Sequence, residues 1–96
     1  MKGNIENYIP TGRENKISRQ SLCMCTGLTD RVMREYISEA RSRGKAIVGD
    51  PAGGYYMAET EADIRLLMNE LMSRMMKLYG CYDAVVKEAR ALGRIA

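Results

Sequence analysis

The sequence contains no histidine and no Gly-x-x-x-x-Gly-Lys phosphate loop. Histidine is the usual proton shuttle near neutral pH, and the phosphate loop is a common cradle for nucleotides. The Gly53-Gly54 pair is too short for such a loop, and a nucleophilic cysteine would lack its histidine base. We therefore expect a binding protein rather than an enzyme, and we expect no cofactor.

Long apolar runs are also missing. No stretch approaches the 18 residues of a membrane helix, and polar residues and glycine interrupt every short apolar run before Pro10, unlike in a signal peptide. We expect no membrane association and a location in the cytoplasm of a bacterial host.

Cysteine is scarce and odd in number, with Cys23, Cys25 and Cys81. In a reducing compartment such residues serve as small apolar side chains, so we expect core or near-core thiols. A metal site is not expected, because histidine is absent and two helical residues two positions apart point about 200° away from each other.

The net charge of +3 is unevenly placed. Residues 1–57 hold nine Lys/Arg against six Asp/Glu, whereas residues 58–96 hold six of each. All of the excess positive charge lies in the N-terminal part, which points weakly to a polyanion there.

The N-terminal half reads as a series of short helices. Apolar residues at 5, 8 and 9 predict a first helix, which Pro10 ends, and residues 15–17 read as extended. Ser18 is placed to cap a second helix that carries Leu22 and Cys25 inward and ends at Gly27. Leu28, in the turn that follows, is expected to be buried.

A third helix is predicted from a Thr29 cap to about Arg43, with one narrow apolar stripe formed by Met33, Ile37 and Ala40. Residues 46–48 and 55–57, separated by a Gly/Pro-rich turn, predict a β-hairpin with Tyr55 and Met57 on one face.

A single long helix is predicted from about 61 to 92, opened by a capping box of Thr60 and Asp63. Gly80 falls at an outer position of the repeat, so we favour a continuous helix over a hairpin bent there. Its apolar residues follow a heptad ladder that is typical of a coiled-coil dimer interface. The ladder is formed by Ile64, Met68, Leu71, Met75, Leu78, Tyr82, Val85, Ala89 and Leu92.

Residues 72, 79 and 86 are also apolar and lie beside the ladder, so the apolar face of the helix is broader than a two-stranded coiled coil requires. Either more than two helices associate, or the N-terminal domain packs along part of the helix, and a helix folded back over its own domain is a further alternative. The chain thus divides into residues 1–58 and a dimerisation helix over 59–96.

The fold class expected is mainly α with a small hairpin. A capped helix, a Thr-Gly-Leu turn and a second helix with one apolar stripe form a helix-turn-helix pattern. Over residues 4–57 the sequence resembles winged helix-turn-helix domains of biotin-repressor type and the small helix-turn-helix proteins of prophages. The stretches that carry the resemblance are Tyr8-Ile9-Pro10, Ile17-Ser18, Leu22, Thr26-Gly27-Leu28, Asp30-Arg31, Met33-Arg34, residues 37–44 and Gly54-Tyr55-Tyr56-Met57.

The resemblance implies double-stranded DNA as partner, with helix 29–43 in the major groove. Residues expected at base edges are Thr29, Arg31, Val32, Arg34, Glu35 and Ser38. Residues that suit phosphates are Ser18, Arg19, Gln20, Arg41, Arg43 and Lys45. Any one of these arginines is equally well explained as a solvated charge paired with a neighbouring glutamate.

In the resemblance the hairpin is the candidate wing, and it departs from the pattern, because residues 50–54 of its turn contain one acid and no basic residue. It either approaches DNA through glycine amides or mainly covers the core.

The function expected is a homodimeric, prophage-type DNA-binding protein, acting as a transcriptional regulator or as an accessory of DNA metabolism. The alternative is a protein-interaction adaptor whose Met-rich C-terminal helix binds a replication or packaging partner.

Overall fold

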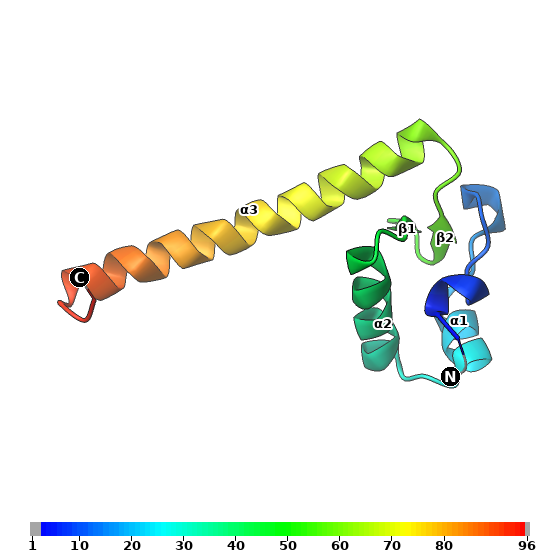
Figure 1. Ribbon diagram of the computed structural model, residues 1–96, viewed down its shortest axis with the longest axis horizontal. Coiled ribbons are helices and arrows are strands. Elements are labelled where there is room, and N and C mark those ends of the chain that lie inside the picture. The colour runs from blue at the N-terminus through cyan, green and yellow to red at the C-terminus, as the bar shows by residue number, and fades with distance from the viewer. Residues whose placement is uncertain (1–2, 96) are drawn as a thin grey trace.

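The computed structural model describes residues 3–95, which form a cluster of short elements followed by one long helix (Figure 1). We call residues 3–58 the N-terminal unit. The elements in chain order are the 3-10 helices η1 (Ile5–Tyr8) and η2 (Arg13–Asn15), helices α1 (Arg19–Thr26) and α2 (Asp30–Ser42), strands β1 (Ile47–Gly49) and β2 (Tyr55–Met57), and helix α3 (Glu61–Ala91). The expected mainly α architecture with one hairpin is confirmed.

Local capping chemistry defines the two central helices. The Ser18 hydroxyl accepts a hydrogen bond from the Ser21 amide at 3.1 Å, and the Thr29 hydroxyl accepts one from the Val32 amide at 3.3 Å. Gly27 ends α1 with a left-handed backbone (φ 74°), which a residue without Cβ adopts at little cost. Both caps and the turn agree with the sequence prediction.

The hairpin pairs Val48 with Tyr56 in antiparallel register, with β1 one residue later than expected. Its free edge is covered by the N-terminal segment, because Ile17 and Tyr55 exchange two backbone hydrogen bonds of 2.9 Å. The Met57 amide also donates to the Pro10 carbonyl at 2.7 Å. The hairpin is therefore held inside the N-terminal unit rather than projecting from it.

The main core lies between η1, α1, α2 and the hairpin. The α2 stripe of Met33, Ile37 and Ala40 is buried as predicted, and Tyr55 and Met57 pack together on this core. The remaining fully buried members of this core are Ile5, Ile9, Leu22 and Ile47.

One expectation for α1 is wrong. Thr26, not Cys25, joins Leu22 in the interior, and Cys25 is exposed. The reason is that α1 packs against α2 on its Cys23 side, where the Cys23 thiol lies 3.6 Å from the Met33 sulfur.

Cys81 is also exposed, so only Cys23 is a near-core thiol in this chain. Leu28, expected to be fully buried, packs on the core but stays half-exposed.

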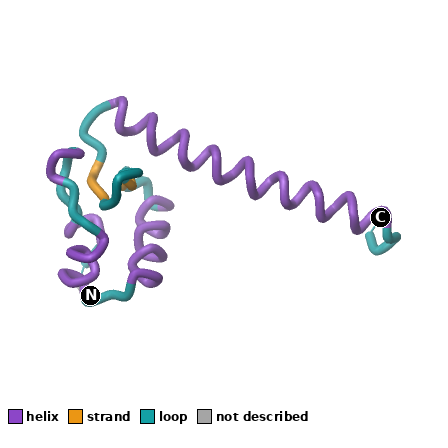
Figure 2. The backbone as a smooth tube through the Cα atoms, turned by 180° about the vertical axis from the view of Figure 1, so that it is seen from behind, coloured by secondary structure: helices purple, strands orange, loops and turns teal. Residues whose placement is uncertain are grey.

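Helix α3 runs without a break through Gly80, as the continuous-helix prediction required. It begins with a complete capping box between Thr60 and Asp63. A second, smaller core attaches it to the N-terminal unit, where Leu67 packs against Val48 and Tyr56 on the outer face of the hairpin. Beyond this contact the helix extends away from the rest of the chain, as Figures 1 and 2 show from opposite sides.

Candidate nucleic-acid interface

The outer face of α2 lies opposite its buried stripe. Arg31, Glu35 and Ser38 all point away from the core, since successive helical residues turn by 100°. The Arg31 side chain is 89% exposed and approaches Glu35 only loosely, at 3.6 Å. Of the other residues expected to contact bases, Val32 is half-buried on the flank and Thr29 is occupied by capping. Arg31 is therefore the most available donor on this face.

Asp30 organises two further arginines at the start of α2. Its carboxylate accepts two hydrogen bonds from Arg19, at 3.1 and 3.0 Å, and one from Arg34 at 2.5 Å. The Arg19 hydrogen bond, together with that of Arg34, lowers the pKa of Asp30, and Asp30 raises the pKa of Arg19. Two guanidinium groups against one carboxylate leave an excess positive charge that is held in place.

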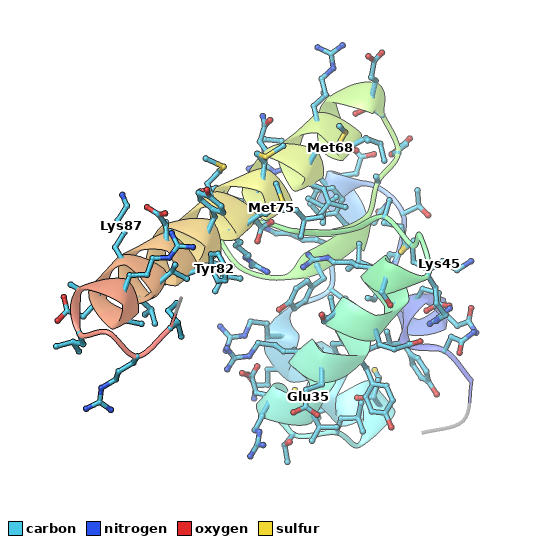
Figure 3. The ribbon with its side chains drawn as sticks, turned by 60° about the vertical axis from the view of Figure 1, so that its left-hand side comes forward. Glu35, Lys45, Met68, Met75, Tyr82 and Lys87 are labelled. Atoms are coloured by element: carbon cyan, nitrogen blue, oxygen red, sulfur yellow. The ribbon has the colours of Figure 1, made fainter. Side chains whose placement is uncertain are left out.

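Ser18, Gln20 and Lys45 are exposed, but Ser18 and Gln20 flank Arg19, which bonds Asp30 at the N-terminal end of α2. The Ser18 hydroxyl already caps α1 and donates to the Ser21 hydroxyl. Lys45 follows the C-terminal end of α2, whereas Glu35 lies nearer its N-terminal end (Figure 3). These three residues form no single phosphate-binding cluster.

Arg43 has a structural role. Its guanidinium donates to Glu39 at 2.8 Å and to both carboxylate oxygens of Glu6, at 3.1 and 3.2 Å. The hydrogen bonds with Glu6 and Glu39 raise the pKa of Arg43. The side chain thereby ties η1 to the end of α2, so its donors are already committed.

The acid in the wing is buried. The Asp50 side chain is 1% exposed and accepts hydrogen bonds from Lys16 at 2.9 Å, Arg13 at 3.1 Å and the Ala52 amide at 3.0 Å. The Ala52 amide and the Lys16 and Arg13 side chains hold the pKa of Asp50 well below its usual range. Asp50 thus presents no repulsive charge to a polyanion, and it fixes the turn to the N-terminal segment.

A concave surface of about 930 Å³ lies between α2, the hairpin and the first half of α3. We call it the α2–α3 groove. Five arginines line it against two acids, so positive charge is in excess. The arginines are Arg13, Arg19, Arg34, Arg41 and Arg74, and the acids are Asp50 and Glu70.

Sequence reasoning missed Arg13 and Arg74 in this groove. Arg74 lies seven residues after Leu67 and so on the same side of α3. Because Leu67 packs on the hairpin, this side of the helix faces the groove. The spacing was visible in the sequence, but nothing there indicated that Leu67, outside the heptad ladder, is the residue that attaches the helix.

The heptad ladder of α3 is uncovered in the single chain. Leu78 is 72% exposed, and the other large ladder residues are exposed as well. Met68, Met75 and Tyr82 extend from the helix in Figure 3. Within residues 3–95, no helix has both the length and the apolar character needed to cross a bilayer.

The shape of the chain also departs from that of a compact monomer. A protein of 10.8 kDa is expected to expose about 5,500 Å², but this chain exposes 6954 Å². Its radius of gyration is 17.1 Å, against about 12.5 Å for a compact chain of this length. The excess surface is roughly 1,400 Å², which is larger than one partner's share of an ordinary interface, about 800 Å².

Comparisons of the chain with known protein families, with curated proteins and with solved structures found no match.

Proposed function

We propose that this chain is a homodimeric, sequence-preferring DNA-binding protein of winged helix-turn-helix type, encoded by a prophage and acting as a transcriptional regulator or an accessory of DNA metabolism. The observation that carries the proposal is the outer face of α2. Arg31, Glu35 and Ser38 are exposed there on a helix that Thr29 caps at its N-terminus and that borders the arginine-lined groove. The major groove, about 12 Å wide, admits one such helix.

The chemistry of this face suits base recognition. Arginine donates two hydrogen bonds to guanine O6 and N7, glutamate accepts from cytosine N4, and serine pairs with several base edges. Arg31 is the strongest candidate for direct readout because its side chain is almost fully exposed and its ion pair with Glu35 is long, at 3.6 Å. Arg19 and Arg34, held by Asp30, are positioned at the N-terminal end of the same helix.

Self-association is supported by the uncovered ladder of α3. Exposed contiguous apolar surface of this extent marks interaction sites in proteins. Pairing two copies through α3 would present two α2 helices to successive major grooves, with half-sites about 34 Å apart or a multiple of that distance.

The adaptor alternative is favoured by a different observation. Met72, Met76 and Tyr79 are exposed outside the ladder, so the apolar face of α3 is broader than a two-stranded seam requires. Flexible methionines suit binding to irregular protein surfaces. In this alternative α3 binds a replication or packaging component, and DNA contact is weak or absent.

Fluorescence anisotropy with a random duplex pool, at about 50 and 200 mM salt, tests the DNA proposal. We expect affinity to fall steeply with salt, since phosphate contacts release counterions. Arg31→Glu should abolish binding without unfolding the chain, because its side chain is exposed. Lys87→Glu is the control, since Lys87 is also exposed, pairs with Asp83 one turn back and lies seven residues after Gly80, at an outer position of the heptad repeat. Absence of wild-type binding at low salt would refute the proposal and leave the adaptor.

A further inference from the structure

The α2–α3 groove combines residues from α2, the hairpin and α3 with Arg13 of η2 and Arg19 of α1. Helix α2 contributes Arg34, Ser38 and Arg41, the hairpin contributes Tyr55, and α3 contributes Arg74. The groove therefore exists only because the long helix is docked on the hairpin. It also extends the positive surface of α2 onto an element that the helix-turn-helix resemblance does not include.

Arg41 is the least neutralised cation of the groove. Its guanidinium Nε donates to the Ile47 carbonyl oxygen at 2.9 Å, and it forms no ion pair with a carboxylate among residues 3–95. Burial lowers the pKa of Arg41, the charge of Glu70 opposes this, and the positive charge of Arg74 lowers it further. Arg41 and Arg74 both line the groove, so an anion placed between them would be attracted by both positive charges.

Arg74 is held in the groove by two features of α3. Leu67, seven residues earlier, packs on Val48 and Tyr56 and fixes the rotation of the helix. The Arg74 guanidinium forms an ion pair with Glu70, one turn back along the same helix. The side chain is still 60% exposed, so its remaining donors are available to a ligand.

We infer that the α2–α3 groove holds one of the two phosphodiester backbones that border the major groove, with Arg41 and Arg74 donating to its phosphates. An α-helix with its side chains is about 10–12 Å across and fills a major groove of about 12 Å, so one backbone runs along each flank. The flank of α2 that carries Arg34 and Arg41 is the one that faces α3. This inference rests on the proposed DNA binding and adds the long helix to the DNA-contacting surface.

The test compares Arg74→Gln with Arg65→Gln. The two arginines share a helix, and each pairs with a glutamate four residues earlier. They are nine residues apart and hence on opposite sides of α3. Arg65 and Arg74 lie on the two sides of the heptad ladder, so either substitution removes one positive charge beside the proposed dimer interface. Only Arg74 lines the groove.

The readout is the slope of log K against log salt, measured by anisotropy with full-length protein and a duplex. Each lost phosphate contact reduces the slope by about 0.9, or about 1.8 for the two chains of a dimer. At about 0.1 M salt this corresponds to roughly 60-fold weaker binding for Arg74→Gln. Arg65→Gln should keep the wild-type slope, and sedimentation should give the same oligomeric state for all three proteins.

Two results would overturn the inference while leaving the proposed function intact. In the first, Arg74→Gln keeps the wild-type slope although Arg31→Glu abolishes binding, so DNA contacts α2 but not the groove. In the second, Arg74→Gln changes only the dissociation constant of the dimer, so a second copy occupies the groove. If the wild type does not bind DNA at low salt, the proposed function and the inference fail together.

Discussion

Two leucines on almost the same side of α3 should respond to truncation in opposite ways. Leu67 and Leu78 are eleven residues apart, which places them within about 20° of each other around the helix. Leu67 is 6% exposed and packs on the hairpin of its own chain, whereas Leu78 is 72% exposed. Leu67→Ala therefore removes an intramolecular contact, whereas Leu78→Ala removes only the contact that Leu78 would make in the proposed dimer.

The expected magnitudes follow from this burial. Truncating a buried leucine to alanine costs about 2–5 kcal/mol, and we expect about 2–3 kcal/mol for Leu67 because its cluster is small. A chain of this length has an unfolding free energy of roughly 5–14 kcal/mol, so the loss would be large. Leu78→Ala should change the stability of the single chain by less than about 0.5 kcal/mol. Over two copies it should cost association about 3 kcal/mol, or roughly 100-fold in the dissociation constant.

Urea unfolding followed by far-UV circular dichroism measures the first effect, and sedimentation equilibrium measures the second. We expect Leu67→Ala to lower the unfolding free energy with association little changed, and Leu78→Ala to show the converse. Equal weakening of association by both variants would mean that Leu67 also belongs to the dimer interface. Unchanged association in Leu78→Ala would refute the ladder as a dimer interface.

Three further substitutions test the backbone and the wing. Gly80→Ala should stabilise the chain by about 1 kcal/mol, because the added Cβ meets open space in mid-helix, and its melting temperature should rise. Gly54→Ala should lower the melting temperature, since φ is +89° and the new Cβ would lie 2.8 Å from the Ile17 carbonyl oxygen. Folding lowers the pKa of the Asp50 carboxyl below its ordinary value of 3.8. The ionised carboxylate therefore stabilises the fold above pH 3.8, and this contribution is lost as the pH falls through the folded-state pKa. Asp50→Asn should therefore be less stable near neutral pH and lose less stability on acidification, as acid titrations of unfolding will show.

Short-range chemistry made the starts of the three α-helices predictable. Ser18, Thr29 and Thr60 each precede a helical run and cap it, because their hydroxyls accept from an amide three residues later. Gly27 ends α1 for an equally local reason. The Cys25 prediction failed because the interior side of α1 depends on where α2 packs, which no residue of α1 specifies.

The candidate site was predictable only in part. The apolar stripe of α2 identified its opposite face, with Arg31 and Glu35, as exposed. The ion pairs that join residues far apart in sequence were not predictable, because they depend on how separate elements pack. Asp50 pairs with Arg13 and Lys16 more than 30 residues away, and Arg43 with Glu6 at a separation of 37.

The sequence did not predict η2 (Arg13–Asn15), since residues 15–17 were expected to be extended. By itself it determined the three α-helices, the residues that cap their starts, and the continuous apolar ladder of α3. These features depend on hydrogen bonds and side-chain spacing within a few residues. Only the tertiary structure decided that Leu67 attaches α3, that the wing acid is buried and neutralised, and that Arg41 and Arg74 face one groove. Those outcomes depend on how separate elements pack, and packing is settled by the burial of the whole chain rather than by any local pattern.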